Sequence, residues 1–118
     1  MCIRDSYEGV ALNPEEKVRL QADLGDNSFL MLHNHGLLTC GATIADTFLM
    51  MFTFQRACEI QVLAQNGGAE LIAIPAPILA GARAMIAGVT RSAQGMGGAL
   101  AWPALLRKLD QLDPGYTL

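Results

Sequence analysis

The residues of this chain with the clearest chemical potential are two histidines, one residue apart, in the run His33-Asn34-His35-Gly36. No other histidines occur in the sequence. A gap of one residue is common for paired zinc ligands, but a catalytic zinc ion takes three protein ligands and keeps one open position. Cys40 would reach the histidines only through a tight hairpin. The residues alone leave two interpretations open: metal ligands, or turn residues that donate hydrogen bonds to nearby carbonyl groups.

Two short apolar runs flank this cluster and are predicted to be strands, over residues 29–32 and 37–40. If the first strand continued, its period of two would place both histidines on one face. A helix is predicted before the strands, because Asn13 and Pro14 suit a helix start and Gly25 suits a helix stop.

Three more helices are predicted downstream. The longest begins with a cap at Thr43 and ends near Gln65, and its apolar stretch from Phe48 to Phe54 must be covered on more than one side. The others are expected over residues 78–94 and 102–112, with a brief edge strand over 71–74 and a flexible joint over 95–98. Alternating helices and short strands, too few for a closed sheet, predict a partial α/β layer.

Composition narrows the classes of protein to which the chain can belong. Its 118 residues allow one domain at most, and a net charge of −3 without a basic stripe excludes a nucleic-acid binder. No run is long enough to cross a membrane, and three cysteines without a C-x-x-C pair favour reduced thiols in the cytoplasm. Charged residues make up 16%, against about 25% in ordinary soluble domains. So apolar a chain is expected to be one subunit of an oligomer, or part of a larger domain.

Three motifs together resemble the class II aldolase/adducin family. They are Asn34-His35-Gly36-Leu37-Leu38-Thr39, Arg56-Ala57-Cys58-Glu59-Ile60-Gln61 and Ala101-Trp102-Pro103-Ala104-Leu105-Leu106. The resemblance extends from Tyr7 to Tyr116. It implies an α/β fold, as a partial three-layer α/β/α class II aldolase-like domain of which residues 7–118 are the C-terminal half. Residues 1–6 are expected to be a non-native leader derived from a sequencing adaptor.

The same resemblance implies a zinc site with His35 as one ligand. The family's other zinc ligands are a His-x-His pair from the first half of the domain, and His33 does not match that pair. The parent is then expected to be a carbon–carbon lyase or epimerase, similar to fuculose-phosphate aldolase and ribulose-phosphate 4-epimerase. Its small-molecule substrate would be a sugar phosphate or a hydroxy or keto acid. No catalytic residue is assigned, and the isolated chain is expected to be inactive.

The resemblance also bears on partners. Family enzymes are commonly homotetramers, so a cytoplasmic homo-oligomer is expected, without nucleic-acid or membrane partners. Adducins share the Asn-His-Gly motif and a segment similar to residues 57–62, yet bind cytoskeletal proteins. A non-catalytic module similar to the adducin head, which binds actin or another cytoskeletal protein, is therefore the alternative function.

Overall fold

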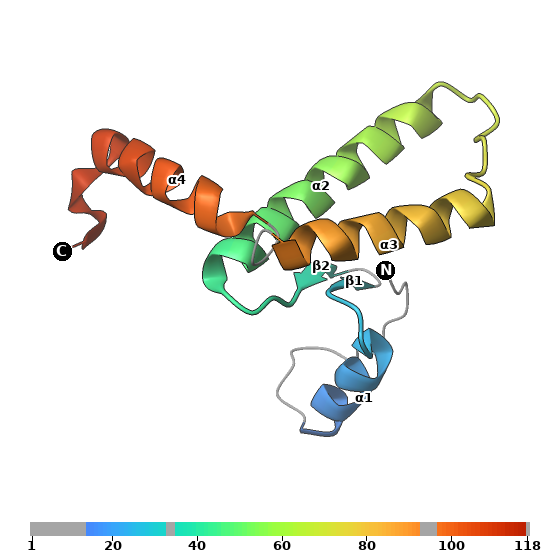
Figure 1. Cartoon of the computed structure of the whole chain (residues 1–118), viewed down its shortest axis with the longest axis horizontal. Coiled ribbons are helices and arrows are strands. Elements are labelled where there is room, and N and C mark those ends of the chain that lie inside the picture. Colours follow the sequence, from blue (N-terminus) through green and yellow to red (C-terminus); the bar gives the residue numbers. More distant parts are fainter. Residues whose placement is uncertain (1–13, 33–34, 93–96, 118) are drawn as a thin grey trace.

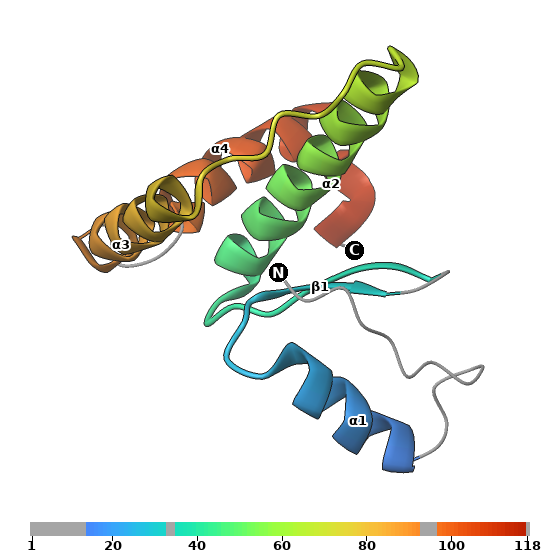
Figure 2. The same cartoon turned by 90° about the vertical axis from the view of Figure 1, so that its right-hand side faces the viewer.

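A computed structural model of the chain describes residues 14–32, 35–92 and 97–117 (Figure 1). Within these residues the order of elements is α1 (Pro14–Leu24), β1 (Phe29–Leu32), β2 (Gly36–Thr39), α2 (Ile44–Asn66), α3 (Ala76–Ser92), α4 (Gly98–Leu112) and the 3-10 helix η1 (Pro114–Thr117). Figure 2 shows the two strands between α1 and α2. This arrangement confirms the predicted partial α/β/α layering.

The two strands form an antiparallel hairpin. Leu32 lies opposite Gly36 at the turn, and Phe29 lies opposite Thr39 at the open end. There the backbone N–H of Cys40 donates to the carbonyl of Ser28 at 3.0 Å. Both strands were predicted, and the second begins and ends one residue earlier than expected.

A small core joins the hairpin to α2. Leu30, Met50 and Phe54 are its buried apolar side chains, and the rings of Phe29 and Phe54 meet edge to face at 5.4 Å. The Thr39 hydroxyl also donates to a carbonyl of α2, that of Thr47, at 3.3 Å. These contacts hold β2 in a fixed position along the first half of α2.

The start of α2 is also the docking point of α4. Thr43 caps α2 as predicted: its hydroxyl accepts from the backbone N–H of Asp46 at 3.1 Å and donates to the Asp46 carboxylate at 3.0 Å. The other carboxylate oxygen of Asp46 accepts from the backbone N–H of Gly98 at 3.1 Å. We call this set of bonds the Asp46 clamp. Close by, Phe48 packs edge to face on Trp102 at 5.4 Å.

The clamp corrects the prediction of a flexible joint over residues 95–98. Gly97 has φ 86° and precedes the first residue of α4, while Gly98 is buried so tightly that a side chain would overlap the backbone of Ala45. The helix therefore begins at Gly98, four residues before the predicted Trp102. Residues 95 and 96 lie outside the described ranges.

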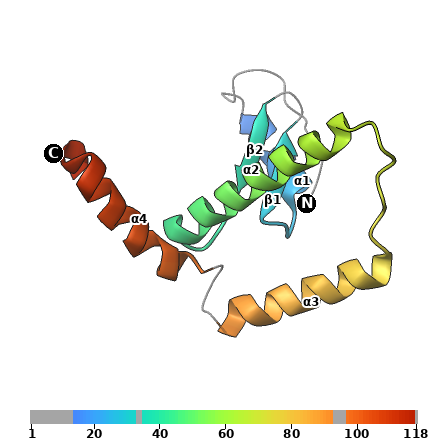
Figure 3. The same ribbon diagram turned by 90° about the horizontal axis from the view of Figure 1, so that it is seen from above.

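Helix α3 extends away from the rest of the chain (Figure 3). It begins at Ala76, and the segment before it has no regular structure, so the edge strand predicted over 71–74 is wrong. A short apolar segment forms a strand only when it pairs with another strand. No described strand lies next to residues 71–74. In the described part of the chain, no helix is both long and apolar enough to cross a membrane.

Candidate functional site

The predicted metal ligand His35 lies in the turn of the hairpin. Its side chain is exposed, and its backbone N–H donates to the carbonyl of Leu32 at 3.4 Å. Because Leu32 is held in register against Gly36, this bond fixes the backbone of His35 relative to the sheet. The imidazole is thus presented to solvent from an anchored position.

Gly36 makes this turn possible. Its φ of 109° lies in the left-handed half of conformational space, where residues with a side chain are strained. An added Cβ would meet nothing within 4 Å, so the requirement is conformational and not one of space. The glycine of the Asn-His-Gly motif therefore allows the chain to enter β2 immediately after the histidine.

The structure places Cys40, the other metal ligand that the sequence offered near the histidines, away from His35. Cys40 follows β2 at the open end of the hairpin, roughly 13 Å along the strand from Gly36. The hairpin is tight, but its turn and its open end lie too far apart for Cys40 to join His35. His33 and Asn34 lie outside the described ranges. Among the residues that are described, no group of three His, Cys, Asp or Glu side chains could hold a metal ion.

An open groove of about 530 Å³ lies at the same end of the hairpin as Cys40. Its lining residues are Thr39, Gly41, Ala42, Thr43, Ile44, Thr47, Phe48 and Met51. The hydroxyl groups of the three threonines already donate hydrogen bonds within the chain, to Thr47, Asp46 and Thr43 in that order. His35 is not part of this lining. The sequence analysis did not predict the groove, because it forms between the end of β2 and the start of α2 only once the two elements pack together.

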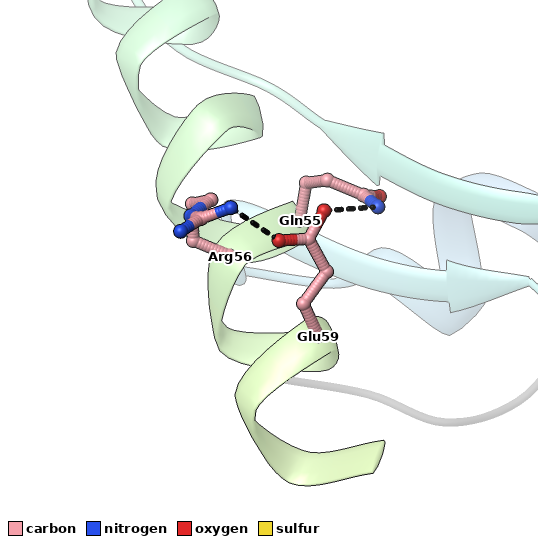
Figure 4. A network of polar contacts seen from close by, with 3 residues as sticks. All are labelled: Gln55, Arg56 and Glu59. Carbon is pink, nitrogen blue, oxygen red and sulfur yellow. Dashed lines mark hydrogen bonds and ion pairs between the residues drawn. The ribbon is translucent and has the colours of Figure 1, made fainter. Parts of the chain in front are cut away.

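The motif from Arg56 to Gln61 lies on α2 and forms a surface network (Figure 4). Arg56 and Glu59, three residues apart on the helix, form an ion pair with 2.6 Å between nitrogen and oxygen. Gln55 donates to the other Glu59 oxygen at 3.4 Å. The Arg56 and Glu59 side chains are 62% and 41% exposed. This network belongs to the exposed surface of the helix.

Tyr116, near the C-terminus, has a raised pKa. The Tyr116 hydroxyl donates to the Asp110 carboxylate at 2.9 Å, and this hydrogen bond raises the tyrosine pKa above its ordinary value near 10. Both residues lie at the far end of α4 and η1, away from the hairpin (Figure 1). The arrangement favours the protonated, hydrogen-bond-donating form of the phenol.

Comparison with known proteins identifies the relatives of this chain. Residues 2–62 match the family described as the class II aldolase and adducin N-terminal domain. A Pseudomonas aeruginosa protein named as a candidate class 2 aldolase is 78% identical over 94% of this chain and 43% of its own length. A similarly named Caulobacter vibrioides protein is 47% identical over 94% of this chain and 42% of its own length.

Two further matches extend the comparison. Rat alpha-adducin is 35% identical over 93% of this chain and 16% of its own length. The crystal structure of an aldolase II superfamily protein from Pseudomonas syringae superposes with a TM-score of 0.72 at 37% identity, over 98% of this chain and 45% of that one. The chain therefore spans less than half the length of the bacterial relatives that it matches.

Proposed function

Because the chain belongs to the class II aldolase and adducin family, we propose that it is part of a zinc-dependent class II aldolase-like enzyme. In this proposal, residues 7–118 are one half of a single domain, and His35 is one of its zinc ligands. The enzyme acts on a small sugar phosphate or on a hydroxy or keto acid, as a carbon–carbon lyase or an epimerase. It works in the cytoplasm as a homo-oligomer.

The observation that supports this proposal is the presentation of His35. Its exposed imidazole stands on an anchored turn, and Gly36 provides the conformation that the turn requires. A neutral imidazole at such a place can bind a metal ion that other segments also ligate. When bound, zinc would act as a Lewis acid toward a substrate carbonyl group.

The described residues do not form a complete zinc site by themselves. His35 supplies one ligand, whereas a catalytic zinc needs three from the protein, and no described group of three exists. We therefore expect the purified 118-residue chain to show no chelator-sensitive turnover of sugar phosphates or hydroxy acids. No catalytic step is assigned to its residues.

Zinc content in a chimera tests the role of His35. The matching 111 residues of the Pseudomonas aeruginosa relative are replaced by those of this chain, and bound zinc is measured by elemental analysis after dialysis. We expect about one zinc per chain, and its loss in His35→Ala. Cys40→Ala is the control, because Cys40 is exposed and able to bind metal but lies at the other end of β2. Full zinc occupancy in His35→Ala would refute the assignment.

The identity with alpha-adducin supports a second candidate function. A non-catalytic module similar to the adducin head would bind a cytoskeletal protein such as actin and would not need zinc. The same chimera separates the two functions. If it folds but binds no zinc at micromolar concentrations, the enzyme proposal fails and co-sedimentation with actin filaments becomes the relevant assay.

A further inference from the structure

Helix α1 buries a glutamate and exposes a valine. Glu16 is the buried residue of this helix, at 2% exposed, whereas Val18, two positions later, is 65% exposed. Charged side chains are almost never fully buried in proteins unless they are paired with another group. The side of α1 that is shielded from water therefore carries a group that ordinarily stays in water.

One oxygen of the Glu16 carboxylate is shielded and has no hydrogen bond. Its Oε1 atom is buried, and no group in the described part of the chain donates to it. An ionised carboxylate is an acceptor at both oxygens, and moving it out of water without a compensating donor is strongly unfavourable. The described residues thus hold a buried acceptor in place without supplying its donor.

Asp46 shows how this chain satisfies a buried acid. It is the other buried charged side chain among the described residues, at 7% exposed. One of its carboxylate oxygens accepts from the Thr43 hydroxyl at 3.0 Å, and the other accepts from the Gly98 N–H at 3.1 Å. Glu16 and Asp46 both lie in the first turn of a helix, so the helix dipole favours both negative charges. They differ in their donors, which are present at Asp46 only.

The relatives of this chain indicate where a donor for Glu16 can lie. The chain spans 43% and 42% of the two bacterial proteins named above, so more than half of each lies outside the matched region. The described sheet consists of β1 and β2, and the outer edge of each has no partner among the described strands. Unpaired edges are where further strands add. Because α1 packs on β1, a segment that adds beside β1 also lies next to α1.

We propose that the other half of the domain donates a hydrogen bond to the buried Glu16 carboxylate, through an N–H or O–H group such as those that bind Asp46. Glu16 is then a contact between the two halves of the domain, and α1 is fully stabilised only when both halves are present. This rests on the proposed function in one respect, that residues 7–118 are half of one domain. Its test involves neither zinc nor turnover, so a failure at Glu16 is distinguishable from a failure of the zinc assignment.

The effect of Glu16→Met on stability should have opposite signs in the 118-residue chain and in the Pseudomonas aeruginosa chimera described above. Methionine removes the carboxylate, keeps the length of the side chain and is a good helix former. In the 118-residue chain a buried acceptor without a donor disappears, so the equilibrium constant for unfolding should fall about tenfold. In the chimera a donor of the other half loses its acceptor, so the constant should rise about tenfold. Urea denaturation followed by far-UV circular dichroism measures both.

Glu15→Met is the matched control in both proteins. Glu15 lies in the same first turn but is exposed, so its substitution removes a similar interaction with the helix dipole and leaves the shielded side intact. The proposal is overturned if Glu16→Met destabilises the chimera no more than Glu15→Met does. It is also overturned if Glu16→Met destabilises the 118-residue chain as much as the chimera, because a donor within this chain, such as Arg19 one turn further along α1, gives that result.

Discussion

Removing the carboxylate of Asp46 should destabilise the fold more than removing any exposed acid on α2. Asp46 is 7% exposed and joins two segments 52 residues apart through its bond to the Gly98 N–H. In Asp46→Ala, that buried N–H loses its acceptor, which costs about 1–3 kcal/mol. Loss of a negative charge from the first turn of α2 costs about another 0.3–1 kcal/mol. The expected decrease in the free energy of unfolding is therefore about 1–4 kcal/mol, with a central value of about 2.5 kcal/mol.

Urea denaturation at a fixed chain concentration measures this decrease. Trp102 is the only tryptophan of the chain, and its contact with Phe48 makes its fluorescence a probe of the packing between α2 and α4. With a slope of about 1–3 kcal/mol per molar urea, the midpoint should fall by roughly 1–2 M. If the alanine variant is already unfolded without urea, the tryptophan emission will show it directly.

Two further variants separate the contributions to this decrease. Asp46→Asn keeps one acceptor oxygen for the Gly98 N–H, but it loses the charge and replaces the oxygen that accepts from the Thr43 hydroxyl with an NH2 donor. We expect a smaller cost than in Asp46→Ala, about 1 kcal/mol. Glu59→Ala removes an acid from the same helix, but Glu59 belongs to an exposed ion pair, worth at most about 1 kcal/mol. If Asp46→Ala unfolds within about 0.5 kcal/mol of the wild type, the clamp does not hold the two helices together.

Two more predictions concern the hairpin turn and the C-terminal tyrosine. Gly36→Ala places a side chain at a φ of 109° and should lower the free energy of unfolding in the urea assay by about 1–3 kcal/mol. Gly67→Ala is the control, because Gly67 has a φ of −71°. Equal effects of the two substitutions would contradict the conformational argument. For Tyr116, ultraviolet titration should show a raised pKa that returns toward 10 in Asp110→Asn; an unchanged pKa would rule out the hydrogen bond as the cause. Since the folded-state pKa is raised, the stabilisation is fully present below about pH 10 and is lost as the pH rises through the folded-state value.

The parts of the fold that depend on local interactions were predictable from the sequence. Thr43 caps α2 by accepting a hydrogen bond from the backbone N–H of Asp46, in the first turn of that helix. Gly25, at φ 52°, ends α1. Neighbouring residues therefore decide both helix boundaries. Both strands were equally accessible, because each is a short apolar run beside a segment that contains glycine. These signals operate over a few residues and do not need the rest of the molecule.

The start of α4 could not be predicted in the same way. Gly97 and Gly98 have the composition of a linker, and only the packing of α4 on Ala45 and Asp46 shows why Gly98 lacks a side chain. The edge strand expected over 71–74 failed for the opposite reason, because its apolar residues have no described strand beside them. Both errors depend on long-range contacts: one forms at Gly98, and none forms with a described strand at residues 71–74. Hydrophobic patterning specifies neither.

The location of His35 and its role differ in how far the sequence could specify them. The residues left a metal ligand and a turn residue both open, and the structure places His35 in a turn, exposed and with an anchored backbone. Its role as a zinc ligand stays a prediction. The tight hairpin that Cys40 would need is present, yet it leaves that thiol at the opposite end of β2. Strand pairing decides which side chains share an end of the sheet, and spacing along the chain does not reveal that choice.

The bond between Asp46 and Gly98 has a consequence for how the chain can vary. It closes everything from the first turn of α2 to the start of α4, including α3, into one loop anchored at its base. The entropy cost of closing a loop grows only with the logarithm of its length, by about 0.6 kcal/mol for each doubling. Insertions or deletions in the connection between α2 and α3 should therefore leave the α2–α4 junction intact. This part of the chain can change in length during evolution, or accept an inserted tag, with little effect on the packed base.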